Sequence, residues 1–203
     1  MKLIARLYDP DEGRILLDGH DLREYDLSAL RGNIGVIFQD FVRYHLTAAD
    51  NIAVGRIDAR DDRARIVTAA KRSLADDVIA KLPLGYDQVI GKRFRSGVDL
   101  SGGEWQKIAI ARAYMRDAQV LILDEPTAAL DARAEFEVFQ RFKELSRGKT
   151  AVLISHRFSS VRMADRIVVL ADGKVDALGT HAELIAQGGR YAELFELQAA
   201  GYR

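Results

Sequence analysis

The 203-residue sequence has no cysteine, only three prolines and no long run of apolar residues. Without cysteine there is neither a disulfide scaffold nor a zinc site built on thiolates, and this composition fits a reducing compartment. The longest apolar runs, at 151–154 and 167–171, fall far short of the roughly 20 residues that a membrane-spanning helix needs. We therefore expect no transmembrane segment in this chain, and its first ten residues lack the organisation of a signal peptide.

An excess of charge of either sign is also absent. Thirty basic residues balance thirty acidic ones, so no global field recruits nucleic acid or an anionic membrane surface. Hydrophobic residues make up 48% of the chain. The length is sufficient to bury a full core, as one domain or as one domain that carries a small subdomain.

Short apolar segments alternate with segments of helical periodicity. We expect strands within 14–19, 34–39, 119–124 and 150–155, and a hairpin over 166–179 that turns at Asp172-Gly173. We expect helices within 27–33, 47–82, 103–115, 131–147, 180–187 and 190–200, while residues 1–8 resemble the last turns of a core helix. Strands that alternate with helices predict a parallel, multilayer α/β core. The 47–82 block is a candidate helical subdomain inserted in that core.

Two helices carry aromatic residues to which we assign packing roles. Phe136, Phe139 and Phe142 follow one another at helical spacing, so we expect them to share a buried face. Trp105 is expected to pack beneath the 103–115 helix. Neither feature requires a ligand.

Polar residues follow three of the expected strands. Gln39 comes after GVIF, Asp124 and Glu125 after VLIL, and His156 after AVLIS. The carboxyl ends of parallel strands collect along one edge of a sheet, so an amide, two acids and an imidazole would surround one ligand there. Taken alone, Asp124 is interpreted equally simply as the cap of a polar turn, and a lone histidine such as His156 is more often capped or packed than catalytic. Their occurrence together favours a site.

A fourth element, LSGGEWQ at 100–106, precedes the 103–115 helix. Gly102 and Gly103 let the backbone approach a ligand closely, and Ser101 offers a hydroxyl where the unpaired amides of the helix start point at an anion. A Ser-Gly-Gly alone is also an ordinary flexible loop. Its position shortly before VLILDEP makes the combination much more specific.

These segments resemble the nucleotide-binding domains of ATP-binding cassette (ABC) transporters, over nearly the whole chain. VIFQD is similar to the Q-loop of that family, LSGGEWQ to its signature, VLILDEP to its Walker B strand, AALD at 128–131 to its D-loop and LISHR to its switch-histidine loop. The opening RLYDPDEG and the closing ADGKVDALGTHAELIAQGGRYAELF are most similar to bacterial exporters whose ATPase is fused behind a membrane domain.

The resemblance implies a fold and roles for individual residues. The fold would be a P-loop NTPase-type parallel sheet flanked by helices, with about 1–45 and 115–203 as α/β core and about 46–114 as the helical signature subdomain. The cofactors would be ATP and Mg²⁺, with Asp124 and Gln39 at the metal, Glu125 as general base and His156 at the γ-phosphate. Further nucleotide contacts would come from Gln39, Ser101, Gly102, Gly103, Gln106 and Asp131.

The resemblance also implies partners. Two such domains close head to tail, so Ser101 and Gly103 of one domain would bind the nucleotide held by the other, and Asp131 would reach across the interface. A transmembrane domain of an exporter would be the second partner, near Gln39. This places the chain peripherally at the cytoplasmic face of the cell membrane, with no nucleic-acid partner.

One motif of the family is missing. The phosphate-binding loop, G-x-x-x-x-G-K-[ST], occurs nowhere in the sequence. In relatives it lies directly before the helix that ends in LIARLYDP, so we expect an N-terminally truncated cassette that also lacks the first strand and the adenine-stacking aromatic. We expect that absence to leave apolar surface of the core uncovered.

The sequence is compatible with three functions. The chain is an ATPase module that couples hydrolysis to export, or a catalytically incompetent subunit that donates only its signature to an intact partner. The third, a soluble ABC ATPase of DNA repair or translation, is disfavoured because the sequence has no long coiled-coil insertion, no zinc module, no second cassette and no basic stripe. The transported substrate is not encoded in this segment, since membrane segments select it.

Overall fold

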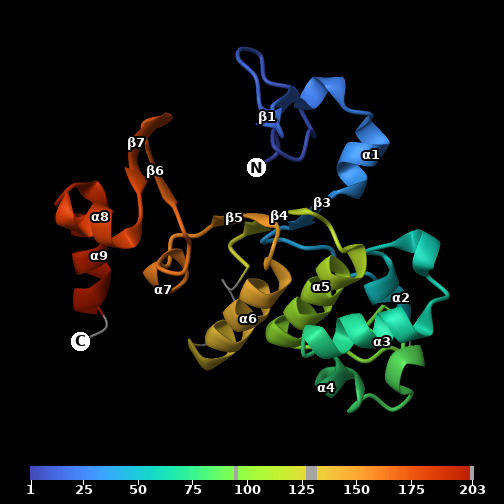
Figure 1. Ribbon diagram of the computed structural model, residues 1–203. Helices are drawn as coiled ribbons and strands as arrows, with labels where there is room; N and C mark the ends of the chain where they lie inside the picture. The colour runs from blue at the N-terminus through green and yellow to red at the C-terminus, as the bar shows by residue number, and fades with distance from the viewer. Residues whose placement is uncertain (94–95, 127–131, 202–203) are drawn as a thin grey trace. The chain divides into compact units, whose positions relative to one another are not determined.

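A parallel sheet forms the centre of the fold. Strand β3 (Ile34–Ile37) pairs in parallel with β4 (Val120–Asp124), with Ile37 opposite Leu123, and β5 (Thr150–Ile154) lies next to β4. The computed structural model describes residues 1–93, 96–126 and 132–201, with only the backbone of 132–134 and 201 (Figure 1). Helices flank the sheet strands in sequence, so the predicted α/β class is confirmed.

The chain divides into two compact units. The first unit is Met1–Val152 and the second is Leu153–Arg203. The first contains β3, β4 and the helices that connect them. The second contains the predicted hairpin and the C-terminal helices.

The first unit begins with turns rather than with the expected end of a helix. The amide of Ala5 donates to the carbonyl of Met1 at 3.1 Å, which is one helical turn, but Arg6 has φ +47° and ends it. A single turn fixes several backbone dihedrals for one hydrogen bond and is not an α-helix. Ala5 nevertheless packs with Ile34 and Ile122 of the sheet in one apolar cluster.

A tight hairpin follows this turn. Strands β1 (Leu16–Leu17) and β2 (His20–Asp21) pair antiparallel. Asp18 and Gly19 between them have φ +50° and +83°, the left-handed pair that suits the twist of a two-residue loop. The chain then reaches β3 through the 3₁₀ turn η1 (Leu22–Glu24) and helix α1 (Leu27–Gly32).

The helical region between β3 and β4 confirms the predicted helical block. Its elements are α2 (Ala48–Ala53), η2 (Ile57–Ala59), α3 (Arg63–Arg72), α4 (Asp76–Ile79), η3 (Gly85–Asp87) and α5 (Gly102–Arg116). Helices α2, α3 and α5 lie side by side (Figure 1). The side chains that are at most 2% exposed here include Ile52, Ile66, Ile79, Ile90, Trp105, Ile108 and Met115. Each contributes about 1.5–3 kcal/mol through burial, and the packing role of Trp105 is confirmed.

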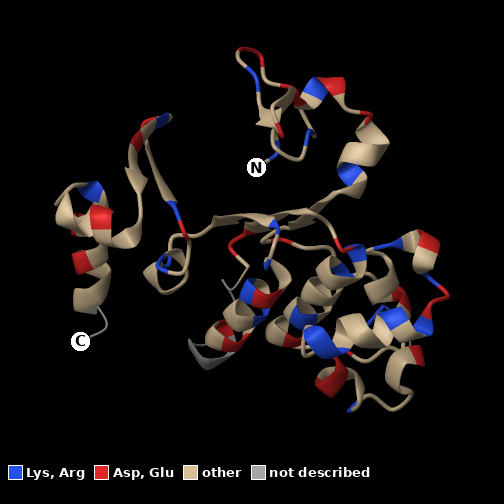
Figure 2. Cartoon of the chain, in the orientation of Figure 1, with Lys and Arg blue, Asp and Glu red and all other residues tan. Residues whose placement is uncertain are grey.

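Charged residues occur along the elements of this helical region. Figure 2 shows basic and acidic residues interspersed along it. Arg56 pairs with Asp58 at 3.2 Å, and Arg63 pairs with Asp87 at 3.3 Å, all on exposed side chains. Exposed pairs of this kind contribute less than about 1 kcal/mol, so this is a solvated face.

Helix α6 (Ala132–Leu145) buries only part of the expected phenylalanine face. Phe139 and Phe142 are each 4% exposed and meet edge to face with ring centroids 6.2 Å apart. Phe136 is 62% exposed, so the prediction that all three are core was wrong. At 3.6 residues per turn, positions 136 and 142 lie about 120° apart, and the buried stripe is centred near Phe142.

Strand β5 is not buried as its apolar sequence suggested. Thr150, Ala151 and Ile154 are exposed, Ile154 to 37%. In the part of the chain that the structure describes, β5 is the last strand of its sheet, so nothing pairs with its second edge. An apolar run shows only that a strand is suited to burial, because the elements packed around the strand determine how much of it is buried.

The second unit contains the predicted hairpin and helices. After α7 (Phe158–Val161), strands β6 (Ile167–Ala171) and β7 (Lys174–Gly179) pair antiparallel around Asp172 and Gly173, both at positive φ. Helices α8 (His181–Ala186) and α9 (Arg190–Gly201) follow. Thr180 and Glu183 form a capping box at the start of α8. On α9, Tyr191 is buried, whereas Leu197 is 63% exposed.

The link between α5 and β4 gives a prediction about pH. Lys149 donates to Asp117 at 2.9 Å, and this bond lowers the pKa of Asp117. A folded-state pKa below the unfolded value adds stability at neutral pH that is lost as the pH falls through the folded pKa. Asp117→Asn keeps a residue that tolerates φ +55° and should cost less than about 1 kcal/mol at neutral pH.

Chemical unfolding at neutral and at acid pH measures this difference. The two proteins should converge in acid, where Asp117 is protonated in both states. Lys149→Gln added to Asp117→Asn is the control and should change little further. A difference that persists unchanged in acid would contradict the ion-pair explanation.

Candidate functional site

Two predicted site segments lie at the same edge of the sheet. Because Ile37 pairs with Leu123, Asp124 lies one residue past this pair on β4 and Gln39 two residues past it after β3. Gln39 is exposed and Asp124 is half-buried. Parallel pairing therefore brings an amide and a carboxylate to the carboxyl edge, where open α/β sheets hold ligands.

Negative charge is concentrated around Asp124. Burial raises the pKa of Asp124, and the carboxylates of Glu125 and Asp40 raise it further, while the amino group of Met1 acts in the opposite direction. The site residues offer carboxylate and amide oxygens, which are the donors that Mg²⁺ prefers, and a cation there would offset the repulsion. Among the described residues no group of three potential ligands is preassembled. Mg²⁺ retains several waters and needs only one or two protein carboxylates.

Glu125 has an unusual backbone conformation. Its φ is +46°, in the left-handed region that non-glycine residues seldom adopt. Its half-buried side chain follows the last residue of β4 directly. The turn from strand to Pro126 is therefore made at the expected general base itself.

The signature serine caps helix α5. The Oγ of Ser101 accepts from the Glu104 amide at 3.3 Å, and the Glu104 carboxylate accepts from the Ser101 amide and hydroxyl, both at 2.8 Å. This is a capping box, which satisfies two of the unpaired donors at the helix start. For the Ser101 hydroxyl to donate to a phosphate, the Glu104 carboxylate must release it.

The other signature residues differ in accessibility. Gly102 and Gly103 form the first turn of α5 and are half-buried. Gln106 is only 4% exposed. A ligand that approaches the helix start reaches Ser101 and the two glycines but not the Gln106 side chain in this arrangement.

His156 belongs to the second unit. It follows β5 and is exposed, and its carbonyl accepts from the Gln198 side chain at 2.8 Å. The amide of Phe158 donates to the same Gln198 side chain at 3.3 Å. Helix α9 thus fixes the backbone on both sides of Arg157. Asp131 lies outside the described residues.

Two residues near the site were not singled out from the sequence. Asp40 directly follows Gln39 and acts on Asp124 electrostatically; its position beside a predicted site residue was the available signal. Glu104 comes three residues after Ser101, which is the spacing of a capping box, so the sequence contained the signal for it.

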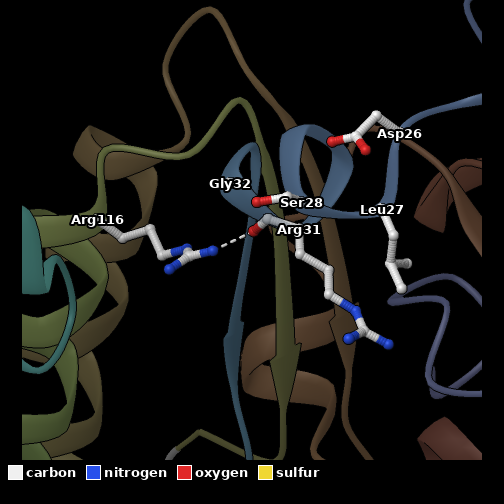
Figure 3. A pocket seen from close by; sticks show the side chains of 6 residues that line it. All are labelled: Asp26, Leu27, Ser28, Arg31, Gly32 and Arg116. Carbon is white, nitrogen blue, oxygen red and sulfur yellow. Dashed lines mark hydrogen bonds between the residues drawn. The ribbon is translucent and has the colours of Figure 1, made fainter.

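A shallow pocket lies elsewhere, beside α1. Figure 3 shows the residues that line it, which are Asp26, Leu27, Ser28, Arg31, Gly32 and Arg116. Its arginines bind backbone: Arg116 donates to the carbonyls of Ile34 and Arg31, and Arg31 donates to the Arg6 carbonyl. The pocket contains none of the predicted site residues.

Comparison with known proteins identifies the family. The family model described as ABC transporter matches residues 1–128. The lipid A-core flippase of Salmonella typhimurium is 46% identical over 196 residues, which are 97% of this chain and 33% of the flippase. An uncharacterized ABC transporter ATP-binding protein of Sinorhizobium fredii is 44% identical over 198 residues, 98% of this chain and 33% of that protein.

A solved structure agrees with these sequence matches. A bacterial Atm1-family ABC exporter with ATP bound superposes with a TM-score of 0.88 at 40% identity, over 98% of this chain and 34% of that chain. The fold is therefore that of the ATP-binding part of an ABC exporter. The chain belongs to the ABC transporter family, as its motifs predicted, and spans about a third of the length of these relatives. In the described part of the chain, no helix has both the length and the apolar character to cross a membrane.

Removal of the Asp124 charge should change stability in a magnesium-dependent way. Asp124→Asn relieves the repulsion with Glu125 and Asp40, so the melting temperature without metal should rise. Added Mg²⁺ should stabilise the wild-type chain and have little effect on the variant, because ligands that bind only the folded state stabilise it.

Asp172→Asn is the matched control for this experiment. It removes one carboxylate at a turn of positive φ that asparagine also tolerates. Thermal unfolding with and without Mg²⁺ measures both effects. Equal stabilisation of wild type and Asp124→Asn by Mg²⁺ would show that the metal binds elsewhere.

The capping box gives a second prediction about this site. Ser101→Ala should destabilise the fold by about 1 kcal/mol through loss of the cap. Glu104→Ala removes the same box but keeps the hydroxyl, and urea unfolding compares the two. A Ser101→Ala variant as stable as wild type would mean that the serine has no structural role.

Proposed function

We propose that this chain acts in ATP binding and hydrolysis by an ABC exporter. The observation that carries the proposal is the parallel β3–β4 pair, which brings Gln39, Asp124 and Glu125 to one edge of the sheet. The matches to a lipid A-core flippase and to an ATP-bound exporter support it. Hydrolysis by the family is coupled to transport, and the exporter's membrane domain would be the partner near Gln39.

The resemblance to ABC cassettes assigns each site residue a role. Asp124 and Gln39 would hold Mg²⁺, which neutralises phosphate charge when bound. Glu125 would accept a proton from the attacking water, and His156 would donate to the γ-phosphate. Ser101, Gly102, Gly103 and Gln106 would contribute nucleotide contacts at the start of α5, and Asp131 would reach across the interface of two domains. Residues of about 46–114 would act as the signature subdomain and the remainder as the α/β core.

The residues present do not form a complete nucleotide site. No phosphate-binding loop occurs among them, and loss of even one preorganised donor costs about 3 kcal/mol in a transition state. The 203-residue chain should therefore bind MgATP weakly and hydrolyse little. The second candidate follows from the same observation: the chain pairs head to tail with an intact cassette at the cytoplasmic face of the membrane and donates its signature.

The two candidates predict different mutant behaviour. The chain is mixed with purified full-length lipid A-core flippase of Salmonella typhimurium, and complex formation and ATP turnover are measured. If the chain only donates its signature, Ser101→Ala should lower turnover by the mixed complex and Glu125→Gln in this chain should not. If the chain hydrolyses ATP itself, Glu125→Gln should abolish its share.

Two outcomes distinguish a chain with impaired ATPase activity from a chain to which the wrong function has been assigned. Robust ATPase activity of the pure chain that is lost in Glu125→Gln would contradict the proposed impairment. Failure of the chain to associate with the flippase, together with the absence of activity, would contradict both candidates.

A further inference from the structure

One connection in the first unit is made by residues outside the predicted site. It joins the segment 42–47, which follows Gln39 and has no regular structure, to the signature helix α5. Two side chains make this connection, Asn51 of α2 and Arg112 of α5. We call them, with the carbonyls that they bind, the Asn51–Arg112 clamp.

Arg112 binds backbone on two sides. Its Nη1 donates to the Val42 carbonyl at 2.7 Å, its Nε to the Asn51 carbonyl at 2.9 Å and its Nη2 to the Asn51 Oδ1 at 2.8 Å. The guanidinium carbon also lies 5.0 Å from the centre of the Tyr44 ring. The fork geometry of one side chain thus ties the 42–47 segment to α2 and α5 together.

Asn51 completes the connection from α2. Its side chain is fully buried, and its Nδ2 donates to the carbonyls of Tyr44, Leu46 and Thr47 at 3.0–3.2 Å. The backbone of this segment is paired at its end, where Thr47 forms an isolated bridge with Val89 and the Leu46 carbonyl accepts from the Ile90 amide at 3.0 Å, and side chains add further bonds along it. The clamp supplies donors to four carbonyls of 42–47.

The choice of arginine is informative because it is costly. Burial lowers the pKa of Arg112 to about 10, and no carboxylate accepts any of its hydrogen bonds among the described residues. An apolar side chain would fill such a position at lower cost. What the guanidinium adds is attachment of two backbone segments in a fixed geometry.

Helices α2 and α5 approach each other closely near the end of α2. Gly55, just after α2, lies so close to α5 that an added Cβ would overlap the carbonyl of Arg112. The backbone just after α2 is therefore in close contact with that of α5, an approach that only glycine permits at this position. A displacement of 42–47 is transmitted to α5 because the clamp fixes the segment to both helices.

We propose that Asn51 and Arg112 are positioning residues that make the segment after Gln39 and the signature helix move as one body. This rests on the proposed function, because it assigns to the clamp the coupling between a metal-site residue and the helix that Ser101 begins. Neither residue is among the predicted nucleotide or metal contacts. They act by setting where Gln39 and Ser101 stand relative to each other.

A spin label tests the connection without nucleotide. The chain has no native cysteine, so Arg43→Cys gives one labelling site on an exposed residue within the segment. Label mobility should be low in this background. It should rise at least about twofold in Arg112→Lys and in Asn51→Asp, because lysine lacks the fork and aspartate cannot donate to the three carbonyls.

Two controls keep this result specific. Arg65→Lys removes a partly buried arginine of α3. Its side chain donates to the Met115 carbonyl of α5 at 3.0 Å and does not reach 42–47. It should leave the label unchanged. The single tryptophan, Trp105, is buried in α5, and its unchanged fluorescence shows that the helix remains packed. Unchanged label mobility in folded Arg112→Lys would overturn the proposal.

A second measurement tests the positioning role. In the mixed ATPase assay with the flippase, Arg112→Lys should lower kcat at least about tenfold with little change in KM, and Arg65→Lys should not. A mobile label with unchanged kcat would overturn the positioning role and leave only a structural contact. If wild-type chain supports no turnover, the proposed function fails, and the label alone decides whether the connection exists.

Discussion

The parallel pairing of β3 with β4 is the constraint on which the rest of the first unit depends. Main-chain hydrogen bonds between these strands fix the register, and the register fixes which residues leave the sheet at the same edge. About eighty residues separate the two strands in sequence, as a crossover connection requires. The helical region is this crossover, and local caps at Ser101 and Asp117 set where its signature helix starts and ends.

The local patterns in the sequence were sufficient for most elements. Buried apolar runs bounded by polar turns located β3 and β4, and Asp172-Gly173 located the second hairpin. The motifs around Gln39, Ser101 and Asp124 predicted the family, which the relatives confirm. These features depend on residues close together in sequence, where spacing and turn chemistry carry the information.

The features that the sequence could not supply depend on contacts between distant segments. The exposure of Phe136 depends on which stripe of α6 faces the core, and that of Ile154 on whether another strand lies beside β5. Neither is encoded in the local run of apolar residues. Arg112 is a similar case, since its carbonyl partners lie 61 and 70 positions away and carry no sequence signature. Asp131 and the roles of the site residues remain predictions.

The left-handed backbone of Glu125 has a consequence for how this position can vary. An L-residue other than glycine costs roughly 1–2 kcal/mol in that region, and asparagine and glycine cost less. Selection for stability alone would therefore favour Gly or Asn at 125. A glutamate at 125 goes against the preference of its own backbone, so the fold gives up stability at a position where a carboxylate stands at the ligand edge of the sheet.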